Sequence, residues 1–237
     1  MLLVCGLIGL VGIFQSCTKT EGEDDFSGNS GTFTDKRDDA KYKWVKIGNQ
    51  IWMAENLAYL PSVSLSDERS TTEPYYYIYG YQGNSVSEAK ATEEYNNYGV
   101  LYNWTAAKKA CPTGWHLPTD EEWKLLEGNV DSEYGVGDQE WNKTGTRGSD
   151  AGKNLKAKSG WDENGNGTDN FGFCGEPGGR QNSWYFDTDG YSGWWWTSTS
   201  EGENTMVHKL ASSYTGVYRT NYTNVFQGLS VRCVRND

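Results

Sequence analysis

Residues 111–123 read CPTGWHLPTDEEW, and the rest of the chain is organised around this stretch. Pro112 and Gly114 are residues that end a helix. Thr119 and Glu122 have the spacing of a capping box, in which the N-cap hydroxyl and the carboxylate three residues later each satisfy a free backbone N–H. The stretch therefore predicts the end of one helix and the start of another at residue 120.

Apolar residues on both sides of this stretch predict which helix faces are buried. On the N-terminal side they recur in steps of four, three and four residues, which predicts an amphipathic helix over 98–111. Its apolar residues are Val100, Trp104, Ala107 and Cys111. On the C-terminal side we expect the new helix to bury Trp123 and Leu126.

The remaining segments have the patterns of strands, turns and loops. Residues 42–57 place short apolar runs on either side of Gly48-Asn49, which is typical of a β-hairpin. The polar stretch 82–97 predicts a long loop, and short apolar runs after residue 170 predict strands joined by turns. We expect the last strand, residues 229–233, to alternate between inward and outward side chains.

Three cysteines fall in the expected folded body, which suggests one disulfide and one spare thiol in an oxidising compartment. Cys111 lies on the apolar face of its expected helix, and Cys233 lies on the apolar face of the expected final strand. We favour a bridge between these two, which leaves Cys174 unpaired. Pairings that involve Cys174 remain open.

The N-terminal segment has the pattern of a lipoprotein signal peptide. Leu2 to Phe14 is apolar, and the residues that follow, Gln15-Ser16-Cys17, resemble a lipoprotein cleavage site. The apolar run would span roughly 20 Å as a helix, too short for a bilayer core of about 30 Å. We expect residues 1–17 to be the signal peptide ending at a lipidated Cys17, and the protein to be an outer membrane lipoprotein on the cell surface or the periplasmic face. The alternative is a buried core helix.

Residues 18–40 are polar, acidic and without periodicity, which predicts a flexible tether. The acidic character close to Cys17 resembles the surface-export signals of Bacteroidetes-type lipoproteins. A plain solvated spacer explains the same composition equally well.

Composition narrows the class of the folded body and of its partners. The aromatic content is 14%, with 29 glycines and 5 prolines, which favours one domain of short strands and turns around large rings. The formal net charge is −11. Because a polyanion repels phosphates, we expect no nucleic-acid partner, and we expect membrane attachment only through the lipid anchor.

Several motifs together resemble the Fibrobacter succinogenes major paralogous domain of Bacteroidetes-type lipoproteins. These motifs lie at residues 52–57, 98–104, 111–119, 166–173, 177–180, 194–199 and 230–234. The resemblance implies a domain over 41–237 with a C-type-lectin-like α+β fold, with two helices, twisted antiparallel sheets and long loops. It also implies a bridge from helix to last strand, in agreement with the pairing favoured above. The family commonly has Phe-Ser-Ala-Leu-Pro-Gly-Gly where this chain has Phe173-Cys174-Gly175-Glu176 before Pro177.

No catalytic set stands out in the sequence. Residues 117–123 resemble a segment of the formylglycine-generating enzymes, but those enzymes need a cysteine pair that is here committed to the expected bridge. His116 and His208 have no nucleophile motif around them. Glycoside hydrolysis needs two facing carboxylates, which the sequence alone does not place together. We therefore expect the protein not to be an enzyme.

Residues 162–169 space oxygen ligands like the start of a calcium loop. The candidate ligands are Asp162, Asn164, Asn166 and Asp169. The position where a bidentate Glu would be required is Phe173, so an ordinary Asn/Gly turn is the alternative. We expect no cofactor other than this candidate calcium ion.

Carbohydrate binding is the function that the aromatic residues suggest, because sugar rings stack on exposed Tyr and Trp. The candidates are Tyr75, Tyr77, Tyr79, Tyr81, Trp194 and Trp196. Three consecutive tryptophans in a strand predict at least one ring on the outer face. The alternative is that these rings build the core.

We expect a non-catalytic surface lipoprotein whose lectin-like domain binds a glycan or a protein ligand through its loops. Two alternatives remain open. The first is a structural or adhesin component of an envelope assembly, and the second is an enzyme with an unrecognised site.

Overall fold

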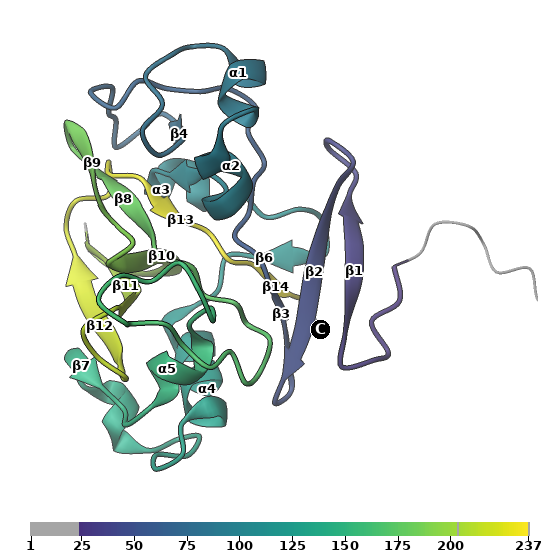
Figure 1. Cartoon of the computed structure of the whole chain (residues 1–237), viewed down its shortest axis with the longest axis vertical. Helices are drawn as coiled ribbons and strands as arrows, with labels where there is room; N and C mark the ends of the chain where they lie inside the picture. The colour runs from purple at the N-terminus through teal and green to yellow at the C-terminus, as the bar shows by residue number, and fades with distance from the viewer. Residues whose placement is uncertain (1–23, 203, 237) are drawn as a thin grey trace, which may run out of the picture.

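The chain folds around two β-sheets with short helices above and below them (Figure 1). The computed structural model describes residues 24–202 and 204–236. The leader and Cys17 lie outside the described residues, so the predictions made for them stay predictions. The α+β class expected from the sequence is confirmed.

The first sheet has five strands in the order β1-β2-β3-β14-β6. Their bounds are β1 Ser30–Asp35, β2 Ala40–Ile47, β3 Gln50–Met53, β6 Trp115–His116 and β14 Val234–Arg235. β2 and β3 pair antiparallel across Gly48, whose positive φ of 59° favours glycine. The predicted hairpin is therefore confirmed.

The second sheet has nine strands, most of them antiparallel, with β13 and β8 parallel to β10. Their bounds are β4 Tyr76–Tyr77, β5 Leu101–Tyr102, β7 Gly145–Arg147, β8 Gly178–Asn182, β9 Tyr185–Asp189, β10 Ser192–Glu201, β11 Asn204–Ala211, β12 Val217–Tyr222 and β13 Leu229–Ser230. β8 and β9 form a hairpin that extends from this sheet at the upper left of Figure 1.

The helices are short, and α4 is the longest. The bounds are α1 Val86–Lys90, α2 Glu93–Tyr98, α3 Trp104–Ala107, α4 Asp120–Val130, α5 Ala151–Leu155 and the 3-10 helix η1 Gln139–Asn142. The capping box of Thr119 and Glu122 is present and begins α4, which buries Trp123 and Leu126 as predicted. The two-helix expectation is wrong, since the described residues form five α-helices. None of these helices is both long and apolar enough to cross a bilayer.

Tryptophan rings dominate the core between the sheets and α4. Trp123 lies 5.1 Å from Trp52 and 5.9 Å from Trp195, measured between ring centroids, and all three are fully buried. Such rings bury about 150–250 Å² each, so few of them suffice for a stable core. The low aliphatic content of the chain is offset in this way.

A buried network of charged side chains lies beneath α4. His208 on β11 places its Nε2 3.0 Å from Asp120 Oδ1 and its Nδ1 2.7 Å from Glu127 Oε1. Glu127 also pairs with the buried Arg147, and Arg219 forms two hydrogen bonds of 2.7 Å with Asp120. Because every carboxylate here has a cation at contact distance, the network holds α4 to the second sheet.

The predicted tether is wrong for its C-terminal part. Residues 30–35 form β1, which pairs with β2 from Ser30 to Asp35. Phe33 on this strand is 3% exposed and stacks on Trp115 at 4.4 Å. Phe26 also packs on Phe33, Trp44 and Trp115, so aromatic packing and strand pairing together bring this segment into the fold.

The predicted helix over 98–111 and the predicted loop over 82–97 are both wrong. Two short helices, α1 and α2, form in the expected loop, and α2 ends at Gly99, whose φ is 72°. Residues 101–102 then pair as β5 with β4 and β13, so only one helical turn, α3, remains of the predicted helix. Strand pairing on both sides of β5 outweighs the helical periodicity.

The predicted last strand is wrong in two respects. It divides into β13 and β14, and residues 231–233 between them are not in a strand. Arg232 was expected to face outward but is fully buried. Its guanidinium is compensated by the oxygen of Asn56 and by backbone carbonyls, which allows it to lie inside.

Candidate functional site

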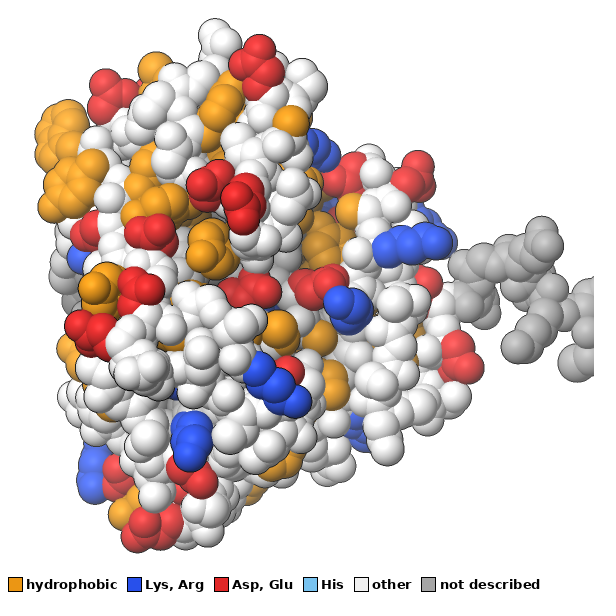
Figure 2. Space-filling model, viewed as in Figure 1, with side chains coloured by type: hydrophobic (Ala, Val, Ile, Leu, Met, Phe, Trp, Pro, Cys, Tyr) orange, Lys and Arg blue, Asp and Glu red, His pale blue; other side chains and the backbone are white. Residues whose placement is uncertain are grey.

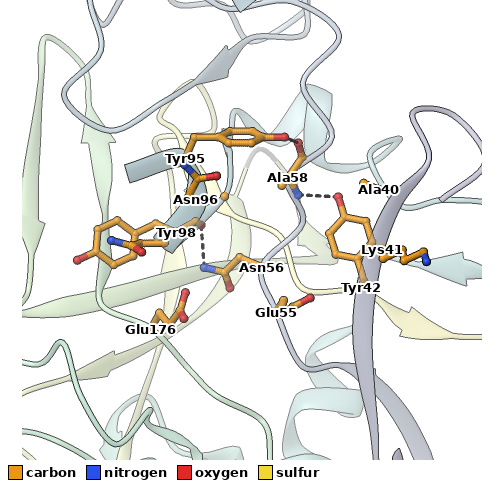
Figure 3. A pocket seen from close by; sticks show the side chains of 12 residues that line it. Ala40, Lys41, Tyr42, Glu55, Asn56, Ala58, Tyr95, Asn96, Tyr98 and Glu176 are labelled. Atoms are coloured by element: carbon orange, nitrogen blue, oxygen red, sulfur yellow. Dashed lines mark hydrogen bonds between the residues drawn. The ribbon is translucent and has the colours of Figure 1, made fainter. Parts of the chain in front are cut away.

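A cleft of about 240 Å³ opens between the first sheet and α2. Figure 3 shows the polar and aromatic side chains that surround it, from β2, from the segment after β3, from α2 and from the segment before β8. The lining residues are Ala40, Lys41, Tyr42, Glu55, Asn56, Ala58, Tyr95, Asn96, Asn97, Tyr98, Gly99 and Glu176.

Two tyrosines fix one wall of the cleft by bonding to the same residue. The Tyr42 hydroxyl accepts a hydrogen bond of 3.0 Å from the Ala58 N–H, and the Tyr95 hydroxyl donates one of 2.9 Å to the Ala58 carbonyl (Figure 3). Gly99 lets α2 end against this segment, because a Cβ there would lie 2.8 Å from the Leu57 carbonyl oxygen. Hydrogen bonds within the protein therefore hold this wall in place.

Asn56 forms the floor of the cleft and is buried. Its Nδ2 donates to the Tyr98 carbonyl at 3.1 Å, and its Oδ1 accepts from Trp195 Nε1 at 2.9 Å and from Arg232 Nη2 at 2.7 Å. Within the described residues, Arg232 forms no ion pair with a carboxylate. A buried positive charge therefore lies under the cleft, and neutral oxygens bind it.

Glu55 and Glu176 place two carboxyl groups on the same cleft (Figure 3). Glu55 accepts a hydrogen bond of 3.0 Å from the Lys43 N–H and pairs with Lys43 Nζ at 3.3 Å. Within the described residues, the only hydrogen-bond contact of the Glu176 carboxyl is the Cys174 thiol at 4.0 Å. Glu176 is therefore the cleft carboxyl with free hydrogen-bonding capacity.

Burial raises the pKa of Glu176 to about 7, with Glu55 adding to the shift and Arg232 opposing it. A carboxyl with such a pKa exchanges its proton near neutral pH, so it can both donate and accept hydrogen bonds there. This property suits a ligand rich in hydroxyl groups.

Tyr98 separates this cleft from a second cleft of about 200 Å³. The second cleft is lined by Asn97, Tyr98, Ser159, Gly160, Glu176 and Pro177, so the two share Asn97, Tyr98 and Glu176. In Figure 2 the middle of this face is hollowed, and acidic side chains lie in the hollow. Burial, together with the acidic neighbours Asp189 and Glu176, raises the pKa of Tyr98, so its phenol stays protonated.

The predicted disulfide joins the segment after α3 to the residue before β14. Cys111 and Cys233 are bonded, with their Cα atoms 5.9 Å apart and a sequence separation of 122. Cys174 is a free, half-buried thiol. The bridge fixes the segment that carries Arg232 beneath the cleft.

The comparisons with known proteins place this architecture in a family. Residues 45–235 match the family described as the Fibrobacter succinogenes major domain (Fib_succ_major). The chain belongs to this family. Neither the curated proteins nor the solved structures contain a significant match.

The predicted tyrosine site does not form as a single surface in this family domain. Tyr77 is fully buried and donates to the Glu68 carbonyl at 2.7 Å, while Tyr81 bonds locally to the Ser85 carbonyl at 3.2 Å. Tyr75 lies half-buried beside Tyr77. Tyr79 alone reaches towards the β8–β9 hairpin, where its ring lies 5.1 Å from that of Phe186.

The prediction of an outward-facing tryptophan ring is wrong. Trp194 is 9% exposed and lies under the cations of Arg180 and Lys209, each 4.8 Å from its ring centroid. Trp195 and Trp196 are fully buried, and Trp196 Nε1 donates to the Tyr102 carbonyl at 2.6 Å. Both faces of β10 are covered, so alternation along the strand exposes none of the three rings.

The predicted calcium ligands direct two of their side-chain oxygens to backbone N–H groups. Asn166 Oδ1 accepts from the Trp161 N–H at 3.0 Å, and Asp169 Oδ1 accepts from the Cys174 N–H at 2.8 Å. Asn164 has a positive φ of 59° in an exposed turn that starts at Asp162. The described residues contain no group of three His, Cys, Asp or Glu that could hold a metal. The geometry favours the alternative, an Asn/Gly turn.

Sequence reasoning missed the residues that line the cleft. Glu55 and Asn56 lie inside the motif at residues 52–57, and Glu176 lies where the chain departs from the usual family pattern. The polar pair Glu55-Asn56 inside an otherwise apolar motif was the signal that could have identified the cleft.

Proposed function

We propose that this domain binds a carbohydrate in the cleft around Tyr98 and Glu176. The observation that carries the proposal is the Glu176 carboxyl, which is largely buried, faces the cleft and has spare hydrogen-bonding capacity. Buried polar groups are normally satisfied, so a ligand group that completes its hydrogen bonds gains free energy. Sugar hydroxyls have the required mixture of donors and acceptors.

Three kinds of group in the cleft suit a sugar. Asn96 and Asn97 offer amides at the rim, Glu55 and Glu176 offer carboxyl oxygens, and Tyr98 offers a ring for stacking. The wall and floor are already held by hydrogen bonds, so little side-chain entropy is lost on binding.

The proposal includes a setting for the domain: a non-catalytic, C-type-lectin-like body displayed by an outer-membrane lipoprotein. The support is the α+β architecture, the bridge from the residues after α3 to the residue before β14, and the lipoprotein pattern of the leader. A lipid on Cys17 would hold the cleft outside the inner membrane.

A glycan array followed by affinity electrophoresis tests the proposal. We expect at least one polysaccharide to retard the protein, Tyr98→Ala to abolish the retardation and Phe171→Ala, which removes an exposed ring outside both clefts, to leave it unchanged. Silence towards host, plant and bacterial polysaccharides would overturn the sugar proposal. Recovery of one envelope protein in every cross-linking experiment would then favour an assembly component.

Hydrolysis of the bound glycan is the second candidate, because two carboxyl groups share the cleft. Glu176, with its pKa of about 7, has the property of a general acid, and Glu55 would have to serve as its partner. The contacts with Lys43 hold the Glu55 carboxylate against β2, which favours binding alone. Release of new reducing ends by the wild type but not by Glu176→Gln would establish hydrolysis.

A further inference from the structure

Two large aromatic rings lie exposed at the tip of the β8–β9 hairpin. Trp184 is 59% exposed and Tyr185 is 56% exposed. Exposed apolar surface of this size costs hydration free energy unless it serves a contact. In Figure 2 apolar side chains gather at the left edge of the face, where Figure 1 places this tip.

The tip is held in place by the loops beside it. The Arg69 guanidinium lies 3.9 Å from the centroid of the Trp184 ring, and the Ser66 hydroxyl donates to the Trp184 carbonyl at 3.2 Å. Gln227 Nε2 donates to Asn182 Oδ1 at 2.6 Å and to Ser183 Oγ at 3.1 Å. The indole is therefore a preorganised platform with much of its surface still open to solvent.

The hairpin connects this tip to the cleft at Tyr98. At the base, Gly178 packs so closely on Tyr98 that an added Cβ would lie 3.0 Å from the Tyr98 Cβ. Gly178 pairs with Asp189, whose Oδ1 accepts a hydrogen bond of 2.5 Å from the Tyr79 hydroxyl. Tyr79 in turn lies against Phe186, next to Tyr185 in the chain.

The distance along the hairpin from the Tyr98 cleft to the tip is longer than one sugar ring. The five residues of β8 span roughly 16 Å at about 3.3 Å per residue. In Figure 2 apolar side chains run from the left edge of the face towards the acidic hollow at its middle. The hairpin and the Tyr79 ring beside it therefore carry aromatic rings and acidic oxygens from the cleft to the tip.

The negative charge along this surface disfavours the binding of anionic polysaccharides. Glu55, Glu176 and Asp189 are acidic, Arg180 is bound to Asp187 at 2.8 Å, and the whole chain carries a net charge of −11. Other cations beside this surface are Lys41 in the cleft and Arg69, which packs on the Trp184 ring. Sulfated or uronate-rich chains would meet like charge, whereas uncharged hydroxyls would meet hydrogen-bond acceptors.

We propose that the cleft is one end of a binding track that runs along the hairpin, and that the track takes a linear, uncharged polysaccharide. The track consists of Tyr98, Asp189, Tyr79, Phe186, Tyr185 and Trp184. This inference rests on the proposed sugar site and extends it from a short saccharide to a chain.

The test compares short and long ligands by calorimetry with the full chain in detergent. The probes are oligosaccharides of two and of six units derived from cellulose, xylan, mannan and starch, with polygalacturonate as the charged counterpart. For the series that binds, we expect Trp184→Ala and Tyr185→Ala each to weaken the six-unit affinity about tenfold and to leave the two-unit affinity unchanged. Tyr98→Ala should weaken both, and Phe171→Ala should weaken neither.

The outcomes separate the track from the site itself. If the tip variants bind the six-unit ligand as tightly as the wild type while Tyr98→Ala loses both ligands, the track is overturned and the proposed sugar site stands. Tighter binding of polygalacturonate than of every uncharged series would overturn the choice of an uncharged chain. If no probe binds, the track and the proposed function both fail.

Discussion

The network beneath α4 and the cleft at Tyr98 both bury carboxyl groups, but their charges are compensated differently. Beneath α4, Asp120 pairs with Arg219 and Glu127 pairs with Arg147, and His208 contacts both carboxylates. In the cleft, Glu176 has no cation at contact distance among the described residues, and burial raises its pKa to about 7. The comparison teaches that satisfied charges mark the scaffold, whereas an unsatisfied carboxyl marks a candidate site.

The largest loss of stability should come from breaking the charged network beneath α4. Glu127→Ala leaves Arg147 buried without its carboxylate, so we expect the free energy of unfolding to fall by about 3–5 kcal/mol. Urea denaturation measures this loss. The double variant with Arg147→Met should lose less than the sum of the two single variants, and strict additivity would show that the pair is not coupled.

Removing the disulfide should cause the next largest loss of stability, because the bridge holds the segment that carries Arg232 beneath the cleft. Replacing Cys111 and Cys233 together with serine should cost about 2–5 kcal/mol, since the closed loop is long. Cys174→Ser is the matched control and should change the urea midpoint little, because that thiol is unpaired. Equal losses in both variants would argue against a structural role for the bridge.

Removing the cleft carboxyl should raise the free energy of unfolding, whereas removing a network carboxyl should lower it. Burial raises the pKa of Glu176 from its ordinary value of 4.5 to about 7 in the folded protein. Ionisation of Glu176 therefore lowers the stability of the folded protein as the pH rises through this range. Glu176→Gln should therefore stabilise the protein by about 2 kcal/mol at pH 8 and have little effect at pH 4. Thermal unfolding at both pH values measures this, and destabilisation at pH 8 would show that Glu176 is paired.

Lowering the pH should destabilise the buried network beneath α4. Burial alone would raise the pKa of Asp120, but hydrogen bonds from His208 and Arg219 outweigh it and hold the pKa well below its usual range. The stability that this carboxylate contributes is present above the ordinary Asp value and is lost as pH falls towards the folded pKa. Asp120→Asn should thus be clearly less stable than the wild type at pH 6 and should approach it below about pH 3. Unfolding by urea across this pH range checks it, and a gap that does not narrow would contradict it.

The smallest effect should come from the helix cap that positions the network. Thr119→Ala removes the N-cap of α4 and should cost about 1 kcal/mol in urea denaturation. The exposed Thr113 provides the matched control, and Thr113→Ala should be neutral. A neutral Thr119→Ala would mean that packing alone fixes the start of α4.

Local patterns predicted the parts of the fold that depend on neighbours in sequence. The capping box and the hairpin around Gly48 need only a few adjacent residues, and both are present. The pairing of Cys111 with Cys233 was also predicted, from the apolar positions of both residues. Local pattern was misleading where distant strands decided the outcome, as at β5, whose pairing with β4 and β13 replaced a predicted helix.

The cleft could not be predicted for the same physical reason. Glu55 follows β3 and Glu176 precedes β8, so two segments far apart in the sequence meet at the cleft. The aromatic excess was informative about the class of ligand but not about its place, because most rings build the core. Trp184 at a hairpin tip carries no periodicity that distinguishes it from the buried Trp194.

The most direct test of the central claim is a carbon-13 NMR titration of the glutamate side-chain carboxyls, with Glu176→Gln to assign the signal. The account predicts one carboxyl that titrates near pH 7 in the free protein, is missing in the variant and shifts when a bound saccharide saturates the cleft. A Glu176 signal that titrates at its ordinary value, or that stays unmoved when saccharide binds, would contradict it.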